Sequence, residues 1–230
     1  GDAYAQYNLG VCYNNGIGVA KNESAAVRLY TLSANQGYAK AQYNLGICYD
    51  NGRGVEKNER EAVHWYTLAA KQGNVDAQYN LGVSYSKGTG VAKNESEAVH
   101  WYTLAAKQGD AKAQNNLGVC YERGMGVAKN ESEAVRWYTL AANQGNSNAQ
   151  YNLALCYRNG TGVVKNEREA VRWYTLAANQ GDSDAQYNLG VCYDSGTGVT
   201  KNEREAVRWY TLAAKQGQAN AIEALKKKKN

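Results

Sequence analysis

Histidine and cysteine most often carry nucleophilic, acid–base or metal-binding chemistry, and this chain has two histidines and five cysteines. His64 and His100 are separated by 36 residues, and the positions one further step away, Arg28 and Arg136, hold arginine. A position shared with arginine is typical of an exposed surface. The metal-binding spacings CxxC and HExxH are absent. The sequence therefore predicts a protein that is not an enzyme, with no catalytic residue, metal site or cofactor.

The cysteines recur at the same spacing, with Ser84 filling the one missing place. Equivalent positions on successive stacked helices lie roughly 9–10 Å apart, beyond the limit of about 7 Å between Cα atoms for a disulfide. We therefore expect small, buried, reduced side chains, which favours a reducing, cytoplasmic compartment. The column consists of Cys12, Cys48, Cys120, Cys156 and Cys192.

A Gly-x-Gly-Val loop, first present as Gly16-Ile17-Gly18-Val19, could bind phosphate, because glycine-rich loops that open a helix do so in other proteins. The pattern recurs six times, however, lacks a third glycine and follows a predicted helix instead of a strand. We interpret these glycines as turn residues that permit positive φ, with the valine packing back onto the core.

All of these spacings belong to one internal repeat. The stretch Ala41-Gln42-Tyr43-Asn44-Leu45-Gly46-Ile47-Cys48-Tyr49 has a counterpart every 36 residues without insertion or deletion. A fixed period of this size is the signature of a stacked repeat array. The expected boundaries are 1–36 for an atypical N-terminal repeat, then 37–72, 73–108, 109–144, 145–180 and 181–216, with 217–230 as a C-terminal capping helix.

Each repeat predicts a pair of helices, called helix A and helix B. In the first repeat helix A covers about residues 3–14, where Ala5, Leu9 and Cys12 share a buried face. Gly10 lies inside this helix and recurs in every repeat except at Ala154, so we expect helix B to cross too closely for a Cβ. The fold class is therefore predicted to be all-α, a solenoid of six antiparallel helix pairs plus a capping helix.

Helix B has clear start and stop signals. In the second repeat Asn58 is a good N-cap, and Glu61 stands three residues later, as in a capping box. Gly73 is placed to end the helix. After the last repeat, Leu225 is positioned to cover the core while the following lysines face water.

Charge and hydropathy exclude two classes of partner. Four of the five net positive charges come from one terminal run, Lys226 to Lys229, whereas nucleic-acid binders carry a basic patch over the folded surface. No apolar run approaches the roughly 18 residues of a membrane helix. Residues 1–3 repeat the phrase at 109–111, so we expect the chain to begin just after a missing repeat, and a targeting segment could be missing with it.

The repeat resembles the Sel1-like repeat, a relative of the tetratricopeptide repeat. The second repeat carries the motif as Asn44-Leu45-Gly46, Tyr49, Gly52, Gly54-Val55, Ala62, Trp65-Tyr66, Ala69-Ala70 and Gln72-Gly73. The resemblance implies a right-handed superhelix whose concave side is lined by helix A, and a role as an adaptor or scaffold for protein complexes. The partner is then a protein or peptide of unknown identity, bound by a monomer.

Two rows of helix A residues would line this concave side. Asparagine offers both a donor and an acceptor to the peptide groups of an extended ligand, and tyrosine offers rigid amphipathic contact area. In the related tetratricopeptide repeat, an asparagine at this position often holds the backbone of a ligand. The candidate peptide-binding residues are Tyr43, Asn44, Tyr79, Asn80, Asn115, Asn116, Tyr151, Asn152, Tyr187 and Asn188.

Other interpretations stay open. The asparagine row could bond a neighbouring helix and the tyrosine row could pack repeat against repeat, in a structural or consensus-designed array without a dedicated ligand. A further row has leucine where the Sel1-like family often has lysine, and it either packs against the preceding repeat or forms an exposed apolar ladder. This row is Leu32, Leu68, Leu104, Leu140, Leu176 and Leu212.

Overall fold

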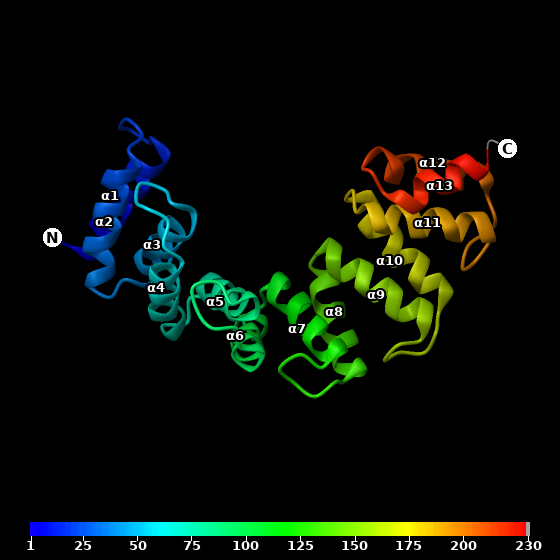
Figure 1. Ribbon diagram of the computed structural model, residues 1–230, viewed down its shortest axis with the longest axis horizontal. Coiled ribbons are helices and arrows are strands. Elements are labelled where there is room, and N and C mark those ends of the chain that lie inside the picture. The colour runs from blue at the N-terminus through cyan, green and yellow to red at the C-terminus, as the bar shows by residue number, and fades with distance from the viewer. Residues whose placement is uncertain (229–230) are drawn as a thin grey trace. The chain divides into compact units, whose positions relative to one another are not determined.

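The computed structural model describes residues 1–228, which form thirteen α-helices and no strands (Figure 1). Helix A and helix B alternate along the chain, and every repeat contributes two helices of equal length. The helices are α1 (Ala3–Asn15), α2 (Glu23–Asn35), α3 (Ala39–Asn51), α4 (Glu59–Lys71), α5 (Val75–Lys87), α6 (Glu95–Lys107), α7 (Ala111–Arg123), α8 (Glu131–Asn143), α9 (Ser147–Asn159), α10 (Glu167–Asn179), α11 (Ser183–Ser195), α12 (Glu203–Lys215) and α13 (Ala219–Lys227).

The chain divides into two compact units, and the division passes through α7. Unit 1 comprises residues 1–113 and 125–127, and unit 2 comprises residues 114–124 and 128–230. Within each unit, helices that are consecutive in sequence pack on one another, for example α3 on α4 and α4 on α5, or α9 on α10 and α10 on α11. The predicted all-α solenoid of helix pairs with a C-terminal helix is therefore confirmed.

The core runs through each helix pair and continues into the neighbouring repeat. In unit 1 a buried cluster joins Tyr66 and Ala69 of α4, Ala77 and Leu81 of α5, and Trp101 of α6. Tyr66 is 1% exposed and Leu81 is 0% exposed. Because each helix pair also buries apolar side chains against the next pair, the repeats stabilise one another.

The glycine inside helix A is explained by a tyrosine of helix B. A Cβ on Gly82 of α5 would lie 2.6 Å from the ring of Tyr102 on α6, too close for two carbon atoms. This confirms that helix B crosses too closely for a side chain. Ala154 is the exception, and Tyr174 of α10 is the equivalent tyrosine.

The start of helix B differs from the predicted capping box in one respect. The side chain of Asn58 accepts a hydrogen bond from the N–H of Glu61 at 3.2 Å, as expected. The reciprocal bond is absent from this repeat, because the N–H of Asn58 donates to the carbonyl of Tyr49 at 2.9 Å. The other end is as predicted: Gly73 has φ +87° and its N–H donates to the carbonyl of Ala70 at 3.0 Å.

A relay of glutamine side chains connects successive repeats, and the sequence analysis did not predict it. Gln72, just after α4, donates from Nε2 to Oε1 of Gln42 in α3 at 2.7 Å. Gln42 is 4% exposed and donates in turn to the carbonyl of Ala34 in the preceding repeat at 3.2 Å. The same two steps recur from Gln180 through Gln150 in unit 2. Each buried amide is therefore satisfied across the junction between two repeats.

The C-terminal cap is partly as predicted. Leu225 of α13 packs against the cluster that contains Tyr210, and Lys226 and Lys227 are exposed. The expectation that all the lysines face water is wrong for Lys228, whose Nζ lies 2.7 Å from a carboxylate oxygen of Asp194. Lys228 occupies the position of the cysteine column, which brings it over the last repeat. Lys229 lies outside the described residues.

Candidate ligand-binding surface

The tyrosine row of helix A packs on the buried tyrosine of helix B in the same repeat. The ring centroids of Tyr43 and Tyr66 are 6.0 Å apart, and those of Tyr187 and Tyr210 are 5.8 Å apart. The helix A tyrosines are half-buried, whereas their helix B partners are buried. Each outer ring therefore rests on a fixed inner ring and keeps one side accessible, an arrangement that suits contact with a ligand.

The asparagine of one repeat lies beside the tyrosine of the preceding repeat. Burial raises the pKa of Tyr43, the nearby Asp76 raises it further, and the side chain of Asn80 acts in the opposite direction. Burial and two nearby carboxylates likewise raise the pKa of Tyr151, and Asn188 opposes this shift. The structure thus brings the two predicted rows together. Unit 1 contains Tyr43, Asn44, Tyr79 and Asn80, and unit 2 contains Asn115, Asn116, Tyr151, Asn152, Tyr187 and Asn188. We call these ten residues the helix A surface, which has a separate part in each unit.

Some asparagines of the helix A surface are bound within the chain. Asn115, which stands where the other repeats have tyrosine, is 8% exposed and accepts a hydrogen bond from Nδ2 of Asn152 at 3.1 Å. Asn188 is 9% exposed and donates from Nδ2 to the carbonyl of Asp184 at 2.9 Å. By contrast, Asn44 and Asn80 are half-buried. The asparagines therefore contribute to the fold in unit 2, and in unit 1 Asn44 lies against Tyr30 and Asn80 against Tyr66.

The last turn of helix A adds charged groups beside these rows. The buried tyrosine of helix B donates from Oη to the acid at this position, as Tyr138 does to Glu122 at 3.0 Å and Tyr210 to Asp194 at 3.4 Å. The fifth repeat differs, because Arg158 takes the place of the acid. In unit 1 the surface contains a hollow of about 310 Å³, lined among others by Asp50, Tyr66, Asn80, Ser84 and Lys87.

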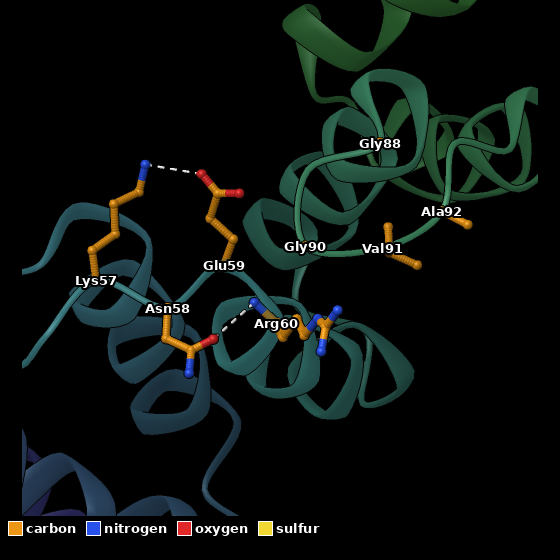
Figure 2. A pocket seen from close by; sticks show the side chains of 8 residues that line it. All are labelled: Lys57, Asn58, Glu59, Arg60, Gly88, Gly90, Val91 and Ala92. Atoms are coloured by element: carbon orange, nitrogen blue, oxygen red, sulfur yellow. Dashed lines mark hydrogen bonds and ion pairs between the residues drawn. The ribbon is translucent and has the colours of Figure 1, made fainter.

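A second kind of hollow lies where neighbouring repeats meet (Figure 2). In unit 1 it has a volume of about 570 Å³ and is lined by the start of α4 and by the loop before α6. Lys57 pairs with Glu59 at 2.9 Å, and Asn58 accepts hydrogen bonds from the first turn of α4. The loop approaches so closely that a Cβ on Gly90 would overlap the carbonyl of Glu59. Because Lys57, Glu59 and Asn58 are already paired, we interpret this hollow as a junction and not as a ligand site.

The remaining candidates lie on the outer side of helix B. His64 and His100 are exposed, as expected, and each ring meets the neighbouring tryptophan edge-on. Residues 1–228 contain no group of three histidine, cysteine or acidic side chains that could hold a metal ion. No helix among them is long and apolar enough to span a bilayer.

The leucine row is expected either to pack against the preceding repeat or to form an exposed apolar ladder, and neither description fits all of its members. Leu32, Leu140 and Leu176 are 45%, 40% and 39% exposed. The others are half-buried, and Leu104 packs against the unit 1 core. The exposed members do not form one uninterrupted ladder.

Comparison with known proteins identifies the repeat. The Sel1 repeat model matches residues 3–38, 39–74, 75–110, 111–146, 147–182 and 183–218. Among solved structures, a protective antigen of uropathogenic Escherichia coli with an SLR fold is 36% identical over 95% of this chain, with a TM-score of 0.91. This chain spans 47% of that protein's length.

Two further structures show the range of similarity. A Sel1 repeat protein from Oxalobacter formigenes is 38% identical, with 92% of this chain and 85% of that protein aligned and a TM-score of 0.82. The Pseudomonas aeruginosa immunity protein PA5088 is 22% identical over 95% of this chain and 82% of its own, with a TM-score of 0.54, so it shares the fold alone. No curated protein is similar enough in sequence to count as a relative.

Proposed function

The chain belongs to the Sel1 repeat family, and from that premise we propose that it is a non-enzymatic scaffold that binds a peptide or protein segment along the helix A surface. Sel1 repeat proteins generally act as scaffolds for protein–protein interactions, so the class of partner is a protein. The proposal adds the location of the binding surface and the extended form of the bound segment. The partner is bound by a monomer, without nucleic acid, cofactor or insertion into a membrane.

The observation that supports this location is the contrast between the two layers of tyrosine. The inner tyrosines of helix B are buried and fix the outer rings, while the outer tyrosines keep an accessible side next to an asparagine of the following repeat. Rigid aromatic area beside amide donors and acceptors suits an extended backbone. In unit 1 a side chain of the bound segment would occupy the hollow lined by Tyr66 and Asn80.

The experiment uses a phage-displayed library of random peptides, selected on the immobilised chain. Retained peptides are then tested against Tyr79→Asn and Tyr187→Asn, substitutions that the fold tolerates because Asn115 stands at the same place. Arg60→Ser on α4 is the matched control, since Ser96 occupies the equivalent exposed position. We expect the tyrosine variants to weaken peptide binding about tenfold while circular dichroism shows them folded, and the control to bind normally.

The second candidate is a structural array without a dedicated ligand. It is favoured by the hydrogen bonds that Asn115 and Asn188 make within unit 2. Under this function the library yields no retained peptide, and Asn152→Ala lowers the thermal midpoint by breaking the bond to Asn115. Peptide binding that survives both tyrosine substitutions would instead place the binding surface elsewhere on the chain.

A further inference from the structure

Arg158 is the one cation in the row formed by the last turn of helix A. The other members are acidic or neutral: Asn14, Asp50, Ser86, Glu122 and Asp194. Arg158 lies in α9 of unit 2 and is half-buried. Among the described residues it makes no ion pair.

The following member of the row is neutralised inside the chain. The carboxylate of Asp194 lies 2.7 Å from Nζ of Lys228 and accepts a hydrogen bond from Tyr210. Arg158 instead donates from Nη1 to Oδ1 of Asn188 at 2.7 Å, and the amide donates from Nδ2 to the carbonyl of Asp184. The neutral amide therefore holds the guanidinium in place and leaves its charge uncompensated by a counterion.

Arg158 also lies beside Tyr174 of α10, whose hydroxyl differs in its hydrogen bonding from the equivalent tyrosines. The hydroxyl of Tyr174 is buried and has no hydrogen-bond acceptor in favourable geometry, whereas Tyr66, Tyr138 and Tyr210 donate to an acid at the equivalent place. Burial raises the pKa of Tyr174 to about 12, and the Arg158 guanidinium beside it holds the pKa below the value that burial alone would give. Burial raises the pKa of Tyr151 and the Arg158 guanidinium opposes this shift, so Arg158 lies near a member of the helix A surface.

We propose that Arg158 binds a carboxylate of the peptide partner, either an aspartate or glutamate side chain or the C-terminal carboxylate. This inference rests on the proposed function. A guanidinium has five N–H donors in a planar fork that matches a carboxylate. The hydrogen bond to Asn188 occupies one nitrogen and leaves further donors for a ligand. Asp182 and Asp184 near Tyr151 disfavour a dianionic phosphate more strongly than a carboxylate with a single charge.

The test uses peptides retained from the random phage-displayed library. Each is synthesised with a free and with an amidated C-terminus, and with every aspartate and glutamate replaced by the matching amide. Dissociation constants are measured by fluorescence polarisation for the native chain, Arg158→Gln and Arg158→Asp. Asp50 and Asp194 already occupy this position, so the fold accommodates aspartate, and circular dichroism verifies it. Arg168→Gln, on the exposed side of α10, is the control for the loss of one positive charge.

We expect the retained peptides to share an acidic group at one place, and Arg158→Gln to weaken their binding about tenfold or more. Arg158→Asp should weaken it further, and Arg168→Gln should leave it unchanged. Loss of binding on amidation assigns the terminal carboxylate, and loss on side-chain replacement assigns an acidic residue. Peptides that bind equally well after Arg158→Gln, or that contain no essential carboxylate, overturn the inference and leave the proposed function standing. A library that yields no peptide overturns both.

Discussion

Gly90→Ala tests how closely neighbouring repeats approach in unit 1. Gly90 has φ +71°, and a Cβ there would overlap the backbone of Glu59 and Arg60 at the start of α4. Two other glycines provide controls with the same backbone strain and open space. Gly18 has φ +71° and Gly73 has φ +87°, and no atom lies within 4 Å of a Cβ on either.

The expected loss of stability has two sources, the backbone strain at positive φ and the overlap of the new Cβ with neighbouring atoms. A non-glycine residue in the left-handed region costs about 1–2 kcal/mol, and all three variants have this cost. Only Gly90→Ala adds an overlap with backbone atoms, which no change of rotamer can relieve, so the repeats must separate. Overpacking of this kind costs about 1–3 kcal/mol. We expect Gly90→Ala to lower the free energy of unfolding by about 2–5 kcal/mol, and each control by about 1–2 kcal/mol.

The measurement is urea unfolding followed by circular dichroism, with the slope compared among variants before midpoints are converted to free energies. Gly73→Ala is the closer control, because Gly73 belongs to a repeat in the middle of unit 1, whereas Gly18 belongs to its first repeat. A midpoint for Gly90→Ala equal to that of Gly73→Ala would contradict this prediction. It would show that the close contact between the Gly90 loop and the start of α4 adds no cost beyond the backbone strain.

Three further predictions concern the core and the outer side. Tyr138→Phe should lower the free energy of unfolding by about 1–2 kcal/mol, because it removes a bond to a carboxylate, whereas Tyr174→Phe should not lower it; equal losses in urea unfolding would contradict this. Burial raises the pKa of the Cys156 thiol from 9.0 to about 12, so the folded state holds this proton more tightly. The free energy of unfolding should therefore fall between about pH 9 and pH 12, and an unchanged slope in Cys156→Ser would refute this account. Leu140→Gln should cost less than about 0.5 kcal/mol in thermal unfolding and Leu104→Gln about 1 kcal/mol or more, since Leu140 is 40% exposed and Leu104 packs on the unit 1 core. Similar costs would show that the exposure of a leucine in this row does not decide its contribution to stability.

The helix pairs could be predicted from sequence because their signals are local and repeated. Gly82 inside a helix, Asn58 before one and Gly73 after one each have a single plain structural explanation, and the structure bears all three out. Repetition also allowed each position to be compared with five counterparts. The reciprocal half of the capping box was wrong because the competing acceptor, the carbonyl of Tyr49, belongs to another helix.

Contacts between repeats were harder to predict, because they join residues that are far apart in sequence and chemically unremarkable. Nothing local marks Gln42 as a buried amide with partners in two repeats. The sequence places Arg158 in a variable row, but its ordered position depends on Asn188 in the next repeat. Lys228 lies beyond the last full repeat, so its pairing with Asp194 had no counterpart to reveal it.

The glutamine relay bears on how such a chain changes in length. At the junctions inside each unit the glutamine of one repeat donates the same hydrogen bond to the repeat before it, so these junctions are equivalent. Excision or duplication of one whole 36-residue block rejoins donor to acceptor without loss. Excision or duplication of a block that is not a whole number of repeats leaves a buried amide without its partner. Unequal recombination in whole repeats is therefore close to silent in folding energy, and gene length can drift while the junctions stay intact.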